Sequence, residues 1–497
     1  MILRTSRQLV QSMTSSATVT KKLKLSKEAK KEIQKTEARL RKQDKKRALD
    51  DFPHYENTEI SDYYFENGFR KVYPYHFVFK SYAKRRWLGR SICDVLLEEF
   101  NFPSQSVIPD RCLSGDLKVN DLPITPNYIL QDSDLISHKV HRHELPVLSL
   151  SVIHCFFHHA FISQNNPDTP IKFVYEDDDV LVLSKPASIP VHPCGQYTLN
   201  SMVHILAKEY GRRPLRFIHR LDRQVFVMTS GLMITAKNYD ASLRLTSQIS
   251  AREVKKYYIC QVEGHFPDRV SDASQTCAPG VIACDQPLGP ICAKLGLHAV
   301  VSERDGGKAS LTHFLRLAYN PLTESSLVLC RLFTGRTHQI RVHLQYLGYP
   351  IVDDPLYNST DWGEMKGKGA QYGIPLDEII RRISNNRTAS SYLNENQPFT
   401  EPSHSFDRFK ERISASSSLD SDTQDRLVRS FDHHCPDCRL CYRDPDIQHL
   451  VLRLHAYQYC GLDWSYVAPL PDWATGGMMS PSQELNALVK AGISTLD

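Results

Sequence analysis

The chain has 497 residues, 41% of them apolar, and its 61 Lys or Arg against 56 Asp or Glu give a formal charge of +5. Such a length and composition suit two or three globular domains and exclude a fibre or a wholly disordered chain. The 13 cysteines show no regular framework, which argues against a disulfide-stapled secreted protein and for a reducing compartment. The stretch nearest to a membrane span, 148–162, is broken by three histidines and two serines, so no membrane partner is expected.

Residues 1–60 are expected to form a basic arm that is largely disordered or helical. Between Lys21 and Arg47 the chain carries thirteen Lys or Arg against four acids. A solvated, mobile arm and an arm that grips RNA phosphates both agree with this run of charge. Residues 1–27 contain no acid and many Ser and Thr, which resembles a mitochondrial transit peptide. We expect a cytoplasmic protein, with the mitochondrion and the nucleus as alternatives.

Residues 61–145 are expected to form a small α/β unit. The pattern indicates an aromatic strand at 73–82, a helix at 91–100, and then short strands separated by turns at 115–116 and 120–121. The helix, the SGDLKVN hairpin and the closing SDLI resemble an S4-type RNA-binding domain. A plain structural hairpin explains the same spacing.

A basic cluster in this unit is a candidate RNA contact. Lys84, Arg85 and Arg86 stand directly before the aromatic Trp87. Cationic side chains of this kind bind phosphate oxygens and so position a nucleic acid. We therefore expect a phosphate-facing surface at these three residues.

A second domain is expected at 171–370, after a linker or insertion at 146–170. IKFVYEDDDVLVLSKP indicates two apolar strands around an acidic turn, and 198–210 has the periodicity of a helix. GRTHQIRVHLQYLG, at 335–348, predicts a helix that ends with Gly348 at its C-terminal cap. Strands are expected to dominate between the two helices.

The composition changes after residue 370. Residues 371–443 are rich in Ser, Asn, Asp and Arg and poor in large apolar residues, so we expect a disordered inserted loop. A strand-like stretch follows at 448–459, and 444–475 is expected to complete the second domain with this C-terminal strand. Residues 476–497 are expected to form a tail.

Asp222 is the strongest candidate for chemistry. It lies in FIHRLDRQVFVMTSGLMITAK, close to Arg220 and Arg223 and before a Thr-Ser-Gly turn. Neighbouring cations lower the pKa of a carboxyl group, so this one suits a nucleophile or a base better than an acid. A surface ion-pair cluster is the alternative for an RLDR sequence taken alone.

Several separated motifs together resemble the RluA-type pseudouridine synthases. They are HRLD, TSGL, YEDDDVLVLSKPASIPVHP, KKYYICQVEG, GRTHQIRVHLQYLGYPIVDDPLY and LHAYQY. YYFENGFRKVYPY at 63–75 and PLPDWA at 469–474 resemble the eukaryotic branch that modifies tRNA. The resemblance implies isomerisation of uridine without a cofactor, with RNA as the partner: tRNA first, and mRNA or rRNA as alternatives. No obligate protein partner is expected.

The same resemblance implies the fold. We expect an α+β protein with the pseudouridine synthase fold, a mixed, mostly antiparallel curved sheet with flanking helices, preceded by the small S4-like α/β domain. The active site would lie in a cleft along the middle of the sheet.

The resemblance also implies roles for single residues. Asp222 is the expected catalytic carboxylate, Arg341 its ion-pair partner, and Tyr258 the tyrosine that stacks on the target base. Arg220 is expected to fill the gap left by a flipped nucleotide. The remaining expected RNA contacts of the catalytic domain are Arg223, Arg336 and His338.

One departure from the family pattern lies beside Asp222. The family runs HRLDRxTSG without interruption, whereas four extra residues, VFVM at 225–228, precede Thr229 here. A small misplacement at an active site can cost orders of magnitude in rate. The alternative function is therefore a catalytically disabled RNA-binding protein.

A metal site is the other alternative. Cys435, Cys438 and Cys441 follow His433 and His434, and His455 and Cys460 lie downstream at a zinc-finger-like distance. His455 already belongs to the LHAYQY motif, so we expect no metal ligands in this chain.

Overall fold

The computed structural model describes residues 63–100, 107–149, 171–218, 229–268, 278–293, 295–388, 402–435, 437–439, 444–445, 447–476 and 482–497. The basic arm, most of the linker, the VFVM segment, and Arg220, Asp222 and Arg223 lie outside these residues. Within them, no helix is long and apolar enough to cross a membrane.

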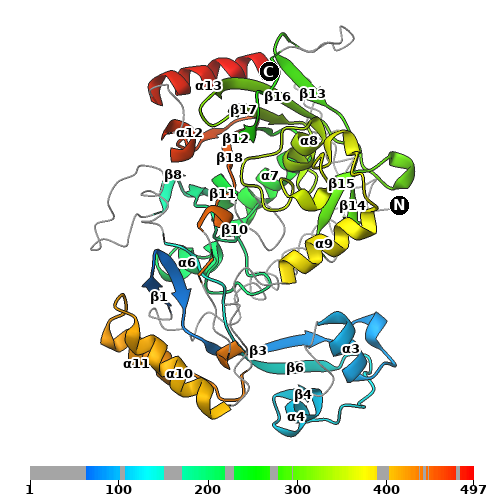
Figure 1. Ribbon diagram of the computed structural model, residues 1–497, viewed down its shortest axis with the longest axis vertical. Helices are drawn as coiled ribbons and strands as arrows, with labels where there is room; N and C mark the ends of the chain where they lie inside the picture. The colour runs from blue at the N-terminus through cyan, green and yellow to red at the C-terminus, as the bar shows by residue number, and fades with distance from the viewer. Residues whose placement is uncertain are drawn as a thin grey trace, which may run out of the picture. The chain divides into compact units, whose positions relative to one another are not determined.

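A ten-stranded sheet forms the centre of the catalytic region (Figure 1). The order is β13-β16-β17-β12-β18-β11-β9-β8, with β10 beside β11 and β19 beside β18. Among the described strands of this sheet, β11 and β18 run parallel and the other paired neighbours run antiparallel. The expectation of a mixed, mostly antiparallel sheet is confirmed. The strands are β8 (Lys172–Glu176), β9 (Val180–Lys185), β10 (Arg216–Phe217), β11 (Ser230–Ala236), β12 (Lys255–Glu263), β13 (Val281–Cys284), β16 (Thr312–Asn320), β17 (Ser325–Leu332), β18 (Leu454–Cys460) and β19 (Ser465–Val467).

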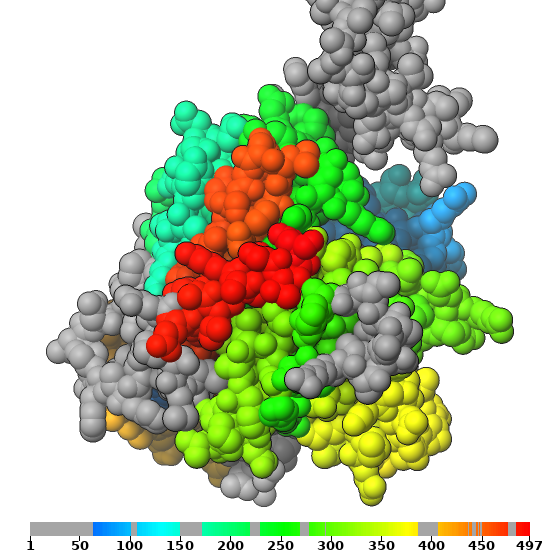
Figure 2. Space-filling view, turned by 90° about the horizontal axis from the view of Figure 1, so that it is seen from above, coloured from blue at the N-terminus to red at the C-terminus, as the bar shows by residue number. Residues whose placement is uncertain are grey.

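Alternation along β12 divides the core between the two faces of the sheet, because successive strand side chains point to opposite sides. Tyr257 and Ile259 pack with helices α12 (Asp472–Gly476) and α13 (Ser482–Leu496). Cys260 and Val262 pack instead with α8 (Gln339–Leu347). In the space-filling view α13, in red, lies across one side of the molecule between the orange and green segments (Figure 2). By the same alternation along β12, Tyr258 lies on the face of the sheet that packs against α8.

The strands β9 and β11 are covered by two further helices. Helices α6 (Met202–Lys208) and α7 (Tyr239–Ser250) pack their apolar side chains against these strands in one continuous cluster. Helix α6 lies inside the predicted range 198–210, and α8 ends at Gly348 in the left-handed conformation (φ 86°), as predicted for its cap. The hairpin of β8 and β9 around Asp177 also confirms the predicted strand pair.

Small antiparallel sheets precede the catalytic region. One contains β1 (Tyr63–Glu66), β2 (Phe69–Val72) and β7 (Val147–Leu148). Another has the order β3-β6-β4-β5, with β3 (Tyr75–Tyr82), β4 (Leu117–Val119), β5 (Leu122–Pro123) and β6 (Leu135–Arg142). Helices α3 (Ile92–Glu99) and α4 (Val107–Leu113) share a hydrophobic cluster with β4 and β6. The predicted strand at 73–82 and helix at 91–100 are confirmed. A two-stranded sheet of β14 (Leu288–Cys292) and β15 (Leu297–Val300) lies further along the chain.

The expectation of a disordered loop at 371–443 is wrong for much of its length. The structure has α9 (Leu376–Thr388), α10 (Pro402–Ala415) and α11 (Ser421–Arg429) there. Ile379 and Ile383, four residues apart on α9, are buried with Trp362. Leu427 of α11 is buried with Ile413 of α10. The apolar residues are few, but helical spacing collects them on single faces, which is sufficient to bury them.

Candidate functional site

Three residues on adjacent strands form a row across the middle of the sheet. Tyr258 of β12 pairs with Ala456 of β18, and Ala456 pairs with Gly231 of β11. Thr229, directly before β11, is buried. The loop that carries Asp222 therefore joins the sheet one strand away from Ala456 and two strands away from Tyr258.

Gly231 is required at this point by the close approach of two backbones. Its φ is 109°, and a Cβ added there would lie 2.3 Å from the carbonyl oxygen of Ala456. Glycine accepts both the positive φ and the contact, whereas any other residue would push β11 away from β18. The Thr-Ser-Gly motif thus fixes where the preceding loop enters the sheet.

A side-chain hydrogen bond between Ser230 and His455 also joins β11 to β18. Ser230 Oγ lies 2.8 Å from Nδ1 of His455. Burial lowers the pKa of His455 to about 3, so the ring is neutral near pH 7. His455 therefore serves as a neutral hydrogen-bonding group between β18 and β11, and the structure does not bring it to the cysteines around 435–438.

Tyr258 lies partly buried between two hydrophobic clusters. One cluster comes from β9, β11, α6 and α7, and the other from β12, β17 and α8. Its hydroxyl is 2.6 Å from the hydroxyl of Tyr459 on β18, and the ring centroids are 5.9 Å apart. Burial, followed by the neighbouring Tyr258, raises the pKa of Tyr459 well above its ordinary value. A neutral, buried Tyr459 thus positions the predicted active-site tyrosine.

Arg341 is buried on α8 and is held by a carboxylate. Its Nε and Nη2 each donate to one oxygen of Asp354 at 2.7 Å, and the two residues are 3% and 2% exposed. Asp354 Oδ1 also accepts from the backbone N–H groups of Leu356 and Tyr357, at 2.9 and 3.0 Å. Burial alone would raise the pKa of Asp354, but the Arg341 charge and these hydrogen bonds outweigh it and hold the pKa below its ordinary value. The pair is therefore ionised and its geometry is fixed.

Asp354 is the partner of Arg341 that sequence reasoning missed. The expected pairing of Arg341 with Asp222 lies outside the described residues, and the partner seen within them is Asp354. Asp354 belongs to the IVDDPLY stretch that follows α8. A signal was present, since an arginine on the apolar face of a buried helix needs a carboxylate to offset its desolvation.

The expected RNA contacts near α8 differ in accessibility. Arg336 is partly exposed and donates through Nε and Nη2 to the carbonyl oxygen of Ala309, at 3.2 Å each. His338 is only 9% exposed, and its Nδ1 lies 2.8 Å from the hydroxyl of Tyr357. Both RNA contacts stay predictions, and Arg336 is the more accessible of the two.

The basic cluster before Trp87 is arranged differently from expectation. Trp87 is 1% exposed and belongs to the core of the small unit, so it supports the cluster from beneath. Arg86 is engaged by Glu99, with 2.8 Å between Nε and Oε1. Lys84 and Arg85 are exposed, and Lys84 Nζ lies 4.8 Å from the centre of the Trp87 ring. The outward positive charge is therefore carried mainly by Lys84 and Arg85.

Comparisons with known proteins give a consistent result. Residues 179–346 match the sequence model described as RNA pseudouridylate synthase, which does not extend over the small N-terminal sheets. The chain is 36% identical over 447 residues to the pseudouridylate synthase RPUSD2 of Mus musculus, covering 84% of this chain and 74% of the relative. It is 32% identical to the mitochondrial tRNA pseudouridine(32) synthase of Saccharomyces cerevisiae, covering 87% and 81%. It is also 28% identical to the tRNA pseudouridine(31) synthase of the same yeast, covering 84% and 98%.

Proposed function

Since the chain belongs to the RNA pseudouridylate synthase family and is a pseudouridine synthase, we propose that it isomerises a uridine in tRNA with Asp222 as the catalytic carboxylate. The observation that carries this proposal is the row of Gly231, Ala456 and Tyr258, which receives the end of the Asp222 loop. The two yeast relatives are named for tRNA positions 32 and 31. We infer a uridine at one of these neighbouring positions, with mRNA and rRNA as the other candidate substrates.

The chemistry explains why one carboxylate is sufficient. The glycosidic bond between C1' and N1 breaks, the uracil rotates, and C1' forms a bond to C5. N1 gains a proton and C5 loses its hydrogen to water, so the reaction needs no oxidant and no cofactor. A carboxylate beside C1' stabilises the positive charge that develops there, and no second carboxylate has to activate a water because the uracil is retained.

Arg341 would hold this carboxylate. Asp354 binds the edge of the guanidinium formed by Nε and Nη2. A planar guanidinium can bind a second carboxylate through its other edge, with directed, charge-assisted hydrogen bonds. Asp222 at that edge would stay ionised and in place, and Asp354 would act as a positioning residue for the ion pair.

Tyr258 would bind the uracil. A ring with its hydroxyl fixed by Tyr459 has lost its rotational freedom before the substrate arrives. It can then stack on a flipped base at little further entropic cost. Its hydroxyl would also exchange a proton with the base during the isomerisation.

The small N-terminal unit would bind the RNA stem. Its β3-β6-β4-β5 sheet with α3 and α4 agrees with the S4-like assignment made from its motifs. The major groove of A-form RNA is too narrow for side chains to read, so such a unit recognises shape and backbone. Lys84 and Arg85 would contact phosphates there.

Tritium release tests the catalytic assignment. Purified protein and tRNA labelled with tritium at uracil C5 should release tritium to water, and Asp222→Ala should abolish this release while leaving RNA affinity within a few-fold. A large loss of affinity instead would make Asp222 structural. If the wild-type protein binds tRNA but releases no tritium, removal of residues 225–228 separates a site disabled by the insertion, which this deletion restores, from a different RNA substrate.

Salt dependence tests the RNA surface, with a matched control in the same cluster. Lys84→Ala and Arg85→Ala should each reduce the slope of log Kd against log salt by about 1, because each would remove one phosphate contact. Arg86→Ala should change the slope less, since Glu99 already engages that charge. Equal slopes for all three variants and the wild type would remove this surface from the RNA site.

A further inference from the structure

Four side chains of the kinds that bind metals converge at a place that includes none of the predicted active-site residues. His141 lies in β6, His143 follows it, Cys435 lies after α11, and Cys438 belongs to the short helix η5 (Asp437–Arg439). One nitrogen or sulfur atom from each lies within 4.8 Å of all the others. Cys435 and His141 are separated by 294 positions in the sequence, so the fold itself brings the two pairs together.

The distances match a tetrahedral metal site. Cys438 Sγ lies 3.4 Å from Nδ1 of His141 and 3.3 Å from Nε2 of His143. Cys435 Sγ lies 3.6 Å from Nε2 of His143. A tetrahedral Zn²⁺ with ordinary bonds to sulfur and nitrogen places its ligand atoms about 3.3 to 3.8 Å from one another. These three distances lie in that range, and all four donor atoms lie within 4.8 Å of one another, so small side-chain shifts would bring them around one ion.

The surroundings suit thiolate ligands. Cys435 and Cys438 are 4% and 5% exposed, and His141 is 9% exposed. The backbone N–H of Asp432 donates to Cys438 Sγ at 3.3 Å, which favours a sulfur that carries negative charge. The Asp432 carboxylate accepts from the backbone N–H of His434 at 2.8 Å, so the turn before the two cysteines is itself fixed.

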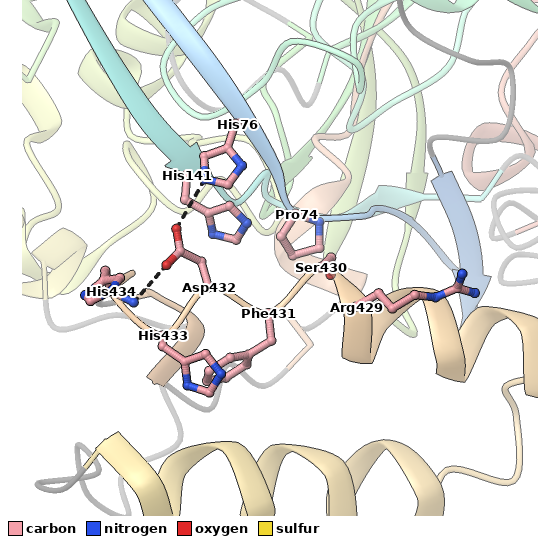
Figure 3. Close-up of a pocket in the computed structure, with 9 residues that line it drawn as sticks. All are labelled: Pro74, His76, His141, Arg429, Ser430, Phe431, Asp432, His433 and His434. Atoms are coloured by element: carbon pink, nitrogen blue, oxygen red, sulfur yellow. Dashed lines mark hydrogen bonds and ion pairs between the residues drawn. The ribbon is translucent and has the colours of Figure 1, made fainter. Parts of the chain in front are cut away.

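An adjoining cavity shows how the two parts of the chain meet. It has a volume of about 440 Å³ and is lined from one side by Pro74, His76 and His141 and from the other by 429–434. Figure 3 shows His76 of β3 pointing at the Asp432 carboxylate, and the two groups are 3.2 Å apart. The His76 and His141 rings lie 4.9 Å apart. The contact between His76 and Asp432 is therefore a second link between the small N-terminal unit and the segment 429–434, in addition to the four candidate ligands.

This arrangement departs from two expectations from the sequence. No metal ligands were expected, whereas the described residues contain four side chains that could hold one ion. Histidines that the sequence suggested as partners of the cysteines make other contacts: His433 packs against Phe431, and His455 bonds to Ser230. Cys441 lies outside the described residues.

We propose that His141, His143, Cys435 and Cys438 bind one Zn²⁺ ion in a structural site. Two thiolates and two imidazoles in a tetrahedral arrangement select zinc over harder cations, which prefer oxygen ligands. Four protein ligands leave no position for a substrate or a reactive water, so the ion has no catalytic role. It fastens the segment between α11 and β18 to β6 of the small N-terminal unit.

Metal content of the full-length protein is the first test. Protein purified from zinc-supplemented medium should contain about one zinc per chain, measured by mass spectrometry of the metal. Cys438→Ser and His143→Ala should lower this content several-fold. His434→Ala, in the adjacent turn, and Cys460→Ser, a partly exposed thiol elsewhere, should retain it. Loss of zinc in His434→Ala with retention in His143→Ala would overturn the ligand assignment.

Cobalt binding tests the site in the wild-type protein, so its result does not depend on whether a variant folds. Apo wild-type protein loaded with Co²⁺ should show the intense visible bands of a tetrahedral ion and a thiolate charge-transfer band, and added Zn²⁺ should remove both. A wild-type protein that contains no zinc and gives no such spectrum would refute the proposal. Thiol counting covers the remaining outcome: two thiols missing without bound metal would identify a disulfide, and a count that is one higher in Cys438→Ser would place it at Cys435 and Cys438. None of these readouts depends on pseudouridine formation.

Discussion

Two adjacent aspartates allow a controlled test of the Arg341 anchor. Asp354 is buried and forms both hydrogen bonds to Arg341, whereas the neighbouring Asp353 faces solvent and pairs with Arg453 at 3.0 Å. The same substitution, Asp→Asn, can therefore be made at two consecutive positions with opposite environments. Asp354→Asn should destabilise the protein strongly, and Asp353→Asn should leave it nearly unchanged.

The structure sets the two magnitudes. In Asp354→Asn the amide oxygen can still accept from the backbone, but its NH₂ group faces a guanidinium nitrogen, and the buried Arg341 charge loses the anion at its Nε edge. Breaking a buried ion pair in this way costs about 3–5 kcal/mol. The side chains of Asp353 and Arg453 are 38% and 28% exposed, and such surface pairs contribute about 0–1 kcal/mol. Asn also tolerates the left-handed conformation of residue 353 (φ 58°).

Hydrogen exchange provides a local assay for this difference. Amide protection in the segment 351–362 should fall by about two to three and a half powers of ten in Asp354→Asn, if opening of this segment carries the full cost. Tritium release should fall with it, since Arg341 would lose its fixed orientation. Asp353→Asn should resemble the wild type in both measurements. Equal effects of the two substitutions would refute the assignment of Asp354 as the anchor.

The same pair predicts a dependence on acid. The folded-state pKa of Asp354 is held below its ordinary value, so its contribution to stability is fully present above the unfolded pKa of about 3.9. That contribution is lost as the pH falls through the lower folded pKa. Urea midpoints of the wild type and Asp354→Asn should therefore differ clearly at pH 7 and converge below about pH 4. A constant difference across this range would contradict the ionised pair.

Two further predictions concern the row across the sheet. Gly231→Ala should cost about 3 kcal/mol or more, because it adds a contact with Ala456 to the strain of a positive φ. Gly306→Ala, at φ 91° with open space around it, should cost only about 1–2 kcal/mol; thermal melting compares the two, and similar losses would contradict the steric argument. Tyr459→Phe removes the 2.6 Å hydrogen bond to Tyr258 and should cost about 1 kcal/mol. It should lower kcat more than it weakens tRNA binding, and an effect on Kd alone would contradict the positioning role.

Much of the fold could be predicted because its signals are local. The helix at 339–347 is marked by apolar residues at helical spacing and by Gly348, whose left-handed cap conformation requires no information from the rest of the chain. The predicted predominance of strands between the two helices is also confirmed, whereas the predicted turn at Thr229-Ser230-Gly231 is wrong, because Ser230 and Gly231 begin β11. Local patterns of this kind can be recognised in a sequence without knowing which residues pack against them in the fold.

The parts that could not be predicted depend on distant partners. Arg341 was expected to need a carboxylate, but its position on the helix does not state which of several aspartates reaches it, and Asp354 is selected by the turn after α8. The cysteines were recognised as a CxxC pair, yet their histidines lie nearly 300 positions away. The nearer His433 and His434 were the natural candidates by sequence distance. Both residues instead line the cavity together with Pro74, His76 and His141.

The position of β18 gives the proposed metal a route to influence the predicted active site. β18 is the last long strand of the sheet in sequence, yet it lies at its centre, so Ala456 separates the entry of the Asp222 loop from the tyrosine predicted to bind the base. The chain reaches β18 only after the described helices α9, α10 and α11. An ion that joins Cys438 to the histidines at the end of β6 leaves only the short stretch from there to Leu454 to be closed, and closing a shorter loop costs less entropy. The proposed zinc ion would therefore favour closure of the chain that leads into the central strand, through four ligands that are not among the predicted RNA contacts.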